Sequence, residues 1–147
     1  MTHLRPARTT DAGTVGAILS EFAETTSWMP SLHTRAENIA HAGHLIDRGW
    51  VTVAEHDGGV VGFIASDGTE IDALYVTRSV RGHGVGSALL DDARAKAAHL
   101  SLWTFQVNVR ACAFYERHGF VEVARTDGSN TDEKLPDVRY EWKVEAA

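Results

Sequence analysis

The residues with the clearest chemical potential form a glycine-rich run, Arg81–Gly86, with an expected strand before it and an expected helix after it. Glycine tolerates positive φ and carries no Cβ that would keep a ligand away from the backbone. A helix that begins near Gly84 directs its free N–H groups and its positive dipole end at one point. The run therefore suits a phosphate or pyrophosphate group.

The spacing of residues within this run indicates which class of phosphate-binding motif it resembles. A Walker loop needs Lys and then Ser or Thr after its last glycine, whereas Ser87 follows Gly86 with no lysine. A dinucleotide fingerprint needs a third glycine, and Leu89 stands in its place. The pattern that is present is R-x-x-G-x-G, formed by Arg81, Gly84 and Gly86. Taken alone, it fits a ligand-free turn equally well.

Two carboxylates and a phenol could move protons near this loop. Glu70 and Asp72 lie two residues apart on an expected strand and so share one face, where repulsion favours proton uptake by one of them. The alternative is a charged, solvent-exposed strand face. Tyr115 could donate a proton to a leaving group, and the alternative is a core aromatic residue. His41 and His44 lack a third ligand at a familiar spacing, so no metal site is expected.

Length and composition indicate one globular domain over residues 1–147. The net charge of −6, without a Lys/Arg cluster, argues against nucleic acid as a partner. A single cysteine, Cys112, excludes an internal disulfide. The first residues lack the apolar core of a signal peptide, and no apolar run is long enough to cross a bilayer. The expected location is the cytoplasm.

Hydrophobic periodicity gives the element order βααβββαβαββ, which predicts a mixed α/β sheet. The expected strands are His3–Ala7, Trp50–His56, Val60–Ala65, Glu70–Val76, Leu102–Val107, Phe120–Ala124 and Val138–Val144. The expected helices are Asp11–Ala23, a segment from Thr34 to Gly49, a segment after Gly84, and Ala111–His118.

Local signals support several of these boundaries. Thr34 and Glu37 have capping-box spacing, and Thr10 is the expected N-cap of the first helix. Asp57-Gly58 predicts a hairpin. The strand Leu102–Val107 is expected to run parallel to Glu70–Val76 by a right-handed crossover. The helix between them has an apolar face made of Val85, Ala88, Leu89, Ala93, Ala97 and Leu100.

A second motif gives the glycine run its context. The segment Asn108–Phe120, NVRACAFYERHGF, resembles the signature N-x-x-A-x-x-F-Y-x-x-x-G-F of the GCN5-related N-acetyltransferase (GNAT) superfamily. The run Arg81–Gly86 resembles the acyl-CoA loop of the same superfamily, and the resemblance covers residues 50–124. It implies an α/β (α+β) fold: a mixed, mainly antiparallel sheet of six to seven strands flanked by about four helices. It also implies direct acetyl transfer from acetyl-CoA to a primary amine.

The resemblance assigns roles to individual residues. It implies that the backbone of Leu74, Tyr75 and Val76 pairs with the pantetheine arm, and that Asn108 and Phe114 lie beside that arm. Tyr115 would protonate the departing thiolate, and Glu70 or water would take the proton of the amine. The pyrophosphate would be held by the segment made of Arg81, Gly82, His83, Gly84, Val85, Gly86 and Ser87.

The resemblance also implies that the acceptor amine approaches from the side opposite the cofactor, between the loop that joins the first two helices and the C-terminal part of the chain. The candidate substrate residues are Trp28, Met29, His33, Asp72 and Arg139. Aromatic and acidic side chains suit a cationic amine with an apolar body, either a small molecule or a peptide amine. The alternative functions are a non-catalytic acyl-CoA sensor or a binder of another phosphorylated ligand. A homodimer, paired through an edge at Val138–Val144, is also open.

Overall fold

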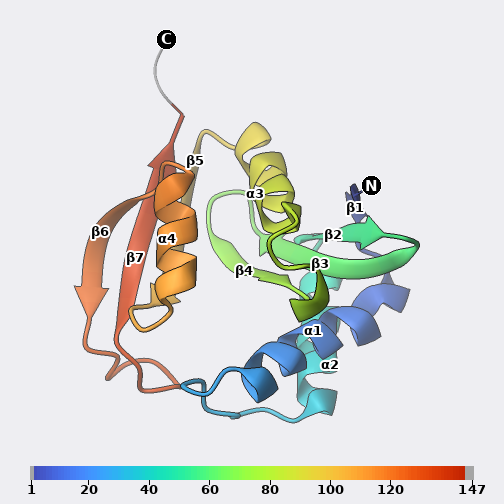
Figure 1. Cartoon of the computed structure of the whole chain (residues 1–147), viewed down its shortest axis with the longest axis horizontal. Helices are drawn as coiled ribbons and strands as arrows, with labels where there is room; N and C mark the ends of the chain where they lie inside the picture. The colour runs from blue at the N-terminus through green and yellow to red at the C-terminus, as the bar shows by residue number, and fades with distance from the viewer. Residues whose placement is uncertain (1, 145–147) are drawn as a thin grey trace.

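The computed structural model describes residues 2–144 and reproduces the predicted element order (Figure 1). Its strands are β1 (Thr2–Pro6), β2 (Val51–His56), β3 (Gly59–Ser66), β4 (Ile71–Val76), β5 (His99–Phe105), β6 (Val121–Thr126) and β7 (Asp137–Lys143). Its α-helices are α1 (Ala12–Thr25), α2 (Arg35–Asp47), α3 (Val85–Ala95) and α4 (Val109–Arg117). Two short 3₁₀ turns are η1 (Thr9–Asp11) and η2 (Arg78–Val80).

The strands form two antiparallel sheets that meet at a single point. One sheet has the order β1-β2-β3-β4 and the other the order β5-β7-β6. Between β4 and β5 there is one parallel bridge, Glu70 to Ser101, where the Ser101 N–H donates to the Thr69 carbonyl at 2.8 Å. The predicted parallel direction is therefore confirmed, but beyond this point the two strands separate.

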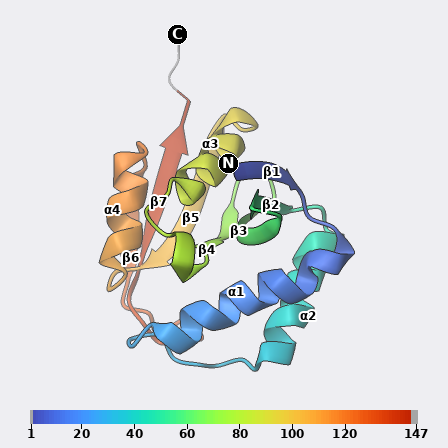
Figure 2. The ribbon, with the colours of Figure 1, turned by 45° about the vertical axis from the view of Figure 1, so that its right-hand side comes forward.

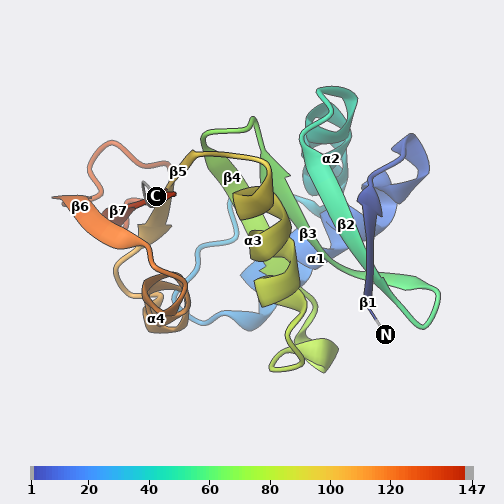
Figure 3. The same ribbon diagram turned by 90° about the horizontal axis from the view of Figure 1, so that it is seen from above.

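Helices cover the sheets on different sides (Figures 2 and 3). Helices α1 and α2 pack together on one face of the four-stranded sheet, and α3 packs on its other face. Tyr115 and Phe120, at the C-terminal end of α4 and just after it, join the core beneath α3. The apolar core consequently consists of two clusters, one on each face of the four-stranded sheet.

The beginning of α2 confirms a prediction from the sequence, and the beginning of α1 corrects one. The Thr34 hydroxyl accepts from the Glu37 N–H, and Glu37 accepts from the Thr34 N–H at 2.8 Å. Thr10, the expected cap of α1, lies instead within η1, and Asp11 precedes the helix. The Asp11 carboxylate accepts from the Arg8 N–H at 2.7 Å and from Arg5 at 2.7 and 3.0 Å. The Arg5 guanidinium lowers the pKa of Asp11 and fixes this acidic residue at the turn.

Two further expectations from the sequence are wrong. Leu100 does not belong to the apolar face of α3, because that helix ends at Ala95 and Leu100 lies on β5 with 1% of its surface exposed. The last strand is not an edge: β7 pairs with β5 on one side and with β6 on the other. The spacing of apolar residues did not show where α3 ends and β5 begins. The order in which strands lie beside one another in a sheet is not encoded in the local sequence of any one strand. The Asp57-Gly58 hairpin is confirmed, with φ of 52° and 81° at its two turn residues.

Close contact between α1 and α2 depends on one glycine. A Cβ added at Gly16 would lie 2.6 Å from the Cα of Ile39, whereas one added at Gly13 would meet nothing within 4 Å. We expect Gly16→Ala to lower the free energy of unfolding by about 1–3 kcal/mol, because the two helices must move apart. The matched variant Gly13→Ala should be neutral or stabilising by up to ~1 kcal/mol. Urea unfolding measures both, and equal midpoints for the two variants would contradict this account of the helix contact.

Candidate functional site

The parting of β4 and β5 lies beside a groove of about 800 Å³. Its walls come from the end of β4, the loop and first turn of α3, the start of α4, and the segment after α1. It contains every residue expected to bind a cofactor except His83: Leu74, Tyr75, Val76, Arg81, Gly82, Gly84, Val85, Gly86, Ser87, Asn108 and Phe114. Tyr115 lines the same groove. Two motifs about 25 residues apart in sequence thus face one space.

The glycine loop presents backbone donors to this groove. Gly82 and Gly84 have φ of 83° and 82°, a conformation that strains other residues, and Gly84 is the N-cap of α3. The first intrahelical hydrogen bond runs from the Ala88 N–H to the Gly84 carbonyl. The N–H groups of Val85, Gly86 and Ser87 therefore have no acceptor within the helix, and an arrangement of this kind can hold an anion at the positive end of the helix.

Arginine side chains add positive charge to the same wall. The groove is lined by Arg78, Arg81, Arg110 and Arg117. Burial lowers the pKa of the Arg81 guanidinium from its ordinary value, and the positive charge of Arg110 adds to this effect. These like charges repel each other, so an anion placed between them would stabilise the arrangement.

A carboxylate on α1 holds the segment that leads into the glycine loop. Glu21 accepts a hydrogen bond from the Arg78 N–H at 2.8 Å and from the Thr77 hydroxyl at 3.1 Å. It therefore fixes the start of η2, just before the anion site. The sequence reading missed Glu21, because it lies 57 residues from Arg78 and matches no local motif.

Tyr115 is buried but its hydroxyl remains free. The side chain is 7% exposed and its ring packs against Phe114, Phe120 and Tyr140, with centroid distances of 5.2, 5.4 and 6.3 Å. Within residues 2–144 its hydroxyl has no hydrogen-bond partner. Burial raises the pKa of the Tyr115 phenol, which keeps it protonated and able to donate at neutral pH.

Two polar contacts tie α4 to neighbouring parts of the groove. The Asn108 side chain accepts from the Ala111 N–H at 3.2 Å and so caps α4. His118 has Nδ1 2.7 Å from the Phe114 carbonyl and Nε2 3.1 Å from the Ser87 hydroxyl. His118, a residue that sequence reasoning missed, therefore links the helix of Tyr115 to the first turn of α3.

The two acidic residues expected near the chemistry lie outside the groove. Neither Glu70 nor Asp72 is part of its lining. Both oxygens of Glu70 accept from the Arg139 guanidinium, at 3.0 and 3.2 Å, and Arg139 also lies over the Trp103 ring at 5.4 Å. Arg139 thus connects Glu70 to the second sheet next to the single bridge between β4 and β5.

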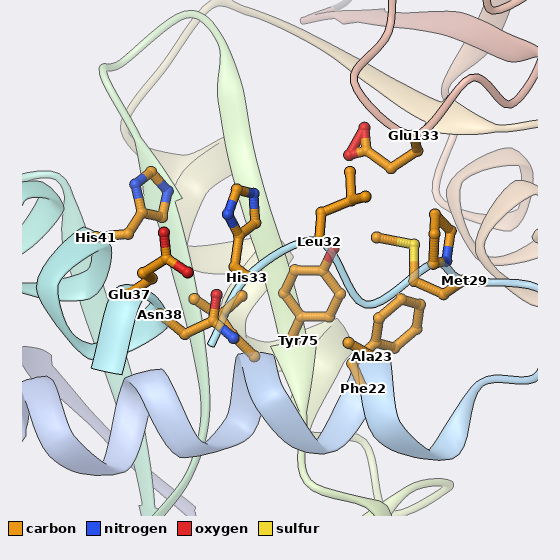
Figure 4. A pocket seen from close by; sticks show the side chains of 12 residues that line it. Phe22, Ala23, Met29, Leu32, His33, Glu37, Asn38, His41, Tyr75 and Glu133 are labelled. Atoms are coloured by element: carbon orange, nitrogen blue, oxygen red, sulfur yellow. The ribbon is translucent and has the colours of Figure 1, made fainter. Parts of the chain in front are cut away.

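A second cavity of about 260 Å³ lies beneath the loop between α1 and α2 (Figure 4). Met29 and His33, both expected to contact the substrate, line it, whereas Trp28 lines the groove. Phe22 and Tyr75 line both spaces and so form their shared wall. Burial raises the pKa of Tyr75 to about 12, and the charges of Glu133 and Asp72 add to this effect.

In the described range, 2–144, no three His, Cys, Asp or Glu side chains gather in a metal-ligating arrangement. None of the helices in this range combines the length and apolar character that crossing a bilayer requires.

The family follows from comparison with known sequences. Residues 47–122 match the family model of the acetyltransferase (GNAT) domain, and this chain belongs to that family. The resemblance predicted from the two motifs is therefore confirmed.

Named relatives resemble about three fifths of the chain. The chain is 34% identical to the peptidyl-lysine N-acetyltransferase YjaB of Escherichia coli over 87 residues. This aligned region covers 59% of this chain and 58% of that protein. The chain is also 31% identical to the 5-NmdU N-acetyltransferase of Pseudomonas phage PaMx11 over 90 residues. This second region covers 56% of this chain and 64% of the phage protein. The chain thus matches less than two thirds of the length of these relatives.

Solved structures share the whole fold. The solution structure of apo-form YjaB from Escherichia coli superposes with a TM-score of 0.79 at 24% identity, over 99% of both chains. The structure of yncA from Salmonella typhimurium, determined with its cofactor acetyl-CoA, gives a TM-score of 0.75 at 19% identity, over 100% of this chain and 96% of that one. At these identities the likeness establishes the GNAT fold that the sequence predicted.

The contact between Glu21 and the Arg78 amide makes a prediction about the loop. We expect Glu21→Ala to speed hydrogen exchange of the Arg78 amide by about tenfold or more, because a hydrogen bond to a charged acceptor is lost. Glu24→Ala, three positions after Glu21 on α1 and paired on the surface with Arg35, is the control and should leave this amide unchanged. Unchanged exchange in the Glu21 variant, measured by NMR, would mean that the loop is held by other contacts.

Proposed function

We propose that this protein is an N-acetyltransferase that moves the acetyl group of acetyl-CoA to a primary amine by direct transfer. The observation that carries the proposal is the shared groove: the free N–H groups at the start of α3 and the free hydroxyl of buried Tyr115 face the same space. Membership of the GNAT family and the names of the relatives support the same reaction.

Each part of acetyl-CoA has a suitable region of the groove. The N–H groups of Val85–Ser87 and the surrounding arginines would hold the pyrophosphate. Beyond its bridge to β5, the open edge of β4 leaves backbone groups of Leu74–Val76 free for the pantetheine arm, since within residues 2–144 β4 pairs along its length only with β3. Phe114 offers an apolar surface beside that path. The bound cofactor supplies an acetyl thioester.

Tyr115 would act as the general acid of the transfer. When the amine attacks the thioester carbonyl, the C–S bond breaks and a thiolate leaves. The Tyr115 hydroxyl, protonated and without another partner in the described chain, would donate its proton to that sulfur. The free hydroxyl also favours an enzyme over the alternative of a non-catalytic acyl-CoA sensor.

The attacking ammonium must first lose a proton. The sequence left two acceptors open, Glu70 and water. We favour water in the groove, because both Glu70 oxygens are held by Arg139 and Glu70 does not line the groove.

The acceptor would enter through the second cavity, on the other side of Phe22 and Tyr75 from the groove. The relatives named as peptidyl-lysine N-acetyltransferases make a lysine side chain one candidate acceptor. A free small-molecule amine is the other.

The role of Tyr115 is tested by removing only its hydroxyl. Tyr115→Phe should lower kcat by roughly 10²–10⁴-fold and leave the KM for acetyl-CoA nearly unchanged, because a general acid acts in the transition state. The matched control is Tyr140→Phe, which removes a buried hydroxyl that donates to Glu116 at 2.6 Å. That variant should lose stability and keep its kcat. Wild-type turnover in Tyr115→Phe would remove the acid role.

The cofactor site is tested by thermal unfolding with acetyl-CoA, free CoA and ATP. A ligand at one hundred times its Kd should stabilise the protein by about 2.7 kcal/mol. We expect this shift with acetyl-CoA and CoA but not with ATP, and we expect Gly84→Val to abolish it. Gly68→Val is the control, because Gly68 also has positive φ, at 103°, and does not line the groove. A full shift in Gly84→Val would place the phosphate site elsewhere.

A further inference from the structure

The second cavity has apolar walls and an acidic residue toward each end. The apolar residues are Leu19, Phe22, Ala23, Met29, Pro30 and Leu32. In Figure 4, Glu37 lies with His33 and His41 on the side of α2, whereas Glu133 lies on the other side, above Leu32 and Met29. The two carboxylates come from segments almost one hundred residues apart in sequence, so their placement on one cavity is a product of the fold.

Glu133 is the more enclosed of the two acidic residues. Its side chain is half-buried, and within residues 2–144 it has no hydrogen bond or ion pair. It lies close enough to Tyr75 for its charge to raise the pKa of that phenol. A half-buried carboxylate without a partner is unfavourable, and an ammonium group beside it would offset that cost.

Glu37 is held in place at the opposite, exposed end. One of its oxygens accepts the Thr34 N–H at 2.8 Å as part of the α2 capping box. That contact lowers the pKa of Glu37, which therefore stays charged at neutral pH. Its second oxygen has no partner in the described part of the chain and remains available to a ligand.

The geometry points to an aliphatic diamine as the acceptor, with one nitrogen beside Glu133, the methylene chain along the apolar wall and the distal ammonium at Glu37. This inference rests on the proposed acetyl transfer and names its substrate class. The end near Glu133 also contains Phe22, Met29 and Tyr75, and two of these residues form the wall shared with the groove. The nitrogen at this end is therefore the one that receives the acetyl group.

Other amines fit the two charges less well. A monoamine leaves one carboxylate without a partner. A lysine side chain within a peptide carries a single ammonium group, and its backbone would have to remain outside a cavity of about 260 Å³. Only an acceptor with two cationic ends pairs both carboxylates.

Calorimetric titration of the protein, with and without CoA, tests the inference without relying on turnover. The probes are 1,5-diaminopentane, 1-aminopentane and Nα-acetyl-lysine methylamide. We expect the diamine to bind about tenfold more tightly than either monocation, the scale of one additional charge contact. Glu37→Gln should reduce diamine affinity to that of 1-aminopentane and leave the monoamine unchanged. Glu133→Gln should weaken both amines.

Each variant has a matched control with the same loss of charge. Asp47→Asn, at the far end of α2, controls for Glu37→Gln, in which glutamine still completes the capping box. Asp132→Asn, the exposed neighbour in the same loop, controls for Glu133→Gln. Neither control residue lines the cavity, and both should bind the diamine as wild type does.

Three results would overturn the diamine inference: equal affinity for diamine and monoamine, equally tight binding of the lysine derivative, or the same loss in the control variants. Failure of the proposed function would look different. A protein that binds the diamine at Glu37 and Glu133 but shows no thermal shift with acetyl-CoA would refute acetyl transfer and retain the cationic site.

Discussion

The single bridge between β4 and β5 is the constraint on which the rest of the site depends. A continuous ladder there would use the backbone groups of β4 and close the space that the groove occupies. Instead, the two sheets are joined by one hydrogen bond from Ser101 to Thr69, by the ion pair between Arg139 and Glu70, and by a shared apolar cluster. The joint is fixed at one end, so the strands can diverge beyond it without separating the sheets.

Around this opening, contacts between distant segments set the positions of the chemical groups. Glu21 holds the Arg78 amide before the glycine loop, and His118 bridges the helix of Tyr115 to Ser87 after that loop. The candidate anion site is therefore supported from both sides by side chains that are not among the defining residues of either motif. Such support restricts loop motion before a ligand arrives, which reduces the ordering cost of binding.

The sequence predicted the parts of this protein that are encoded by short-range chemistry. The capping box of Thr34 and Glu37, the turn at Asp57-Gly58 and the positive φ of Gly84 all follow from neighbouring residues. The order of elements and the family followed from periodicity and two motifs.

Features that depend on tertiary contact were not predictable in the same way. Arg139 meets Glu70 across 69 positions of sequence, and Glu133 reaches the second cavity from an irregular loop. The central position of β7 depends on which strands pair with it when the chain folds. The spacing of Leu100 from its apolar neighbours suits a helix and a strand equally. In each of these cases the deciding partner lies far away in the chain.

Two adjacent residues of α1 take part in different regions of the candidate site. Glu21 anchors the loop of the anion site, and Phe22 forms part of the wall between that site and the second cavity. A shift or rotation of α1 that improves one contact therefore alters the other. Thermodynamic linkage requires that any such effect be reciprocal. If the first ligand changes the binding free energy of the second, the second changes the binding free energy of the first by the same amount. A helix with neighbouring side chains at two sites would therefore couple the affinities of the two ligands, whichever ligand binds first.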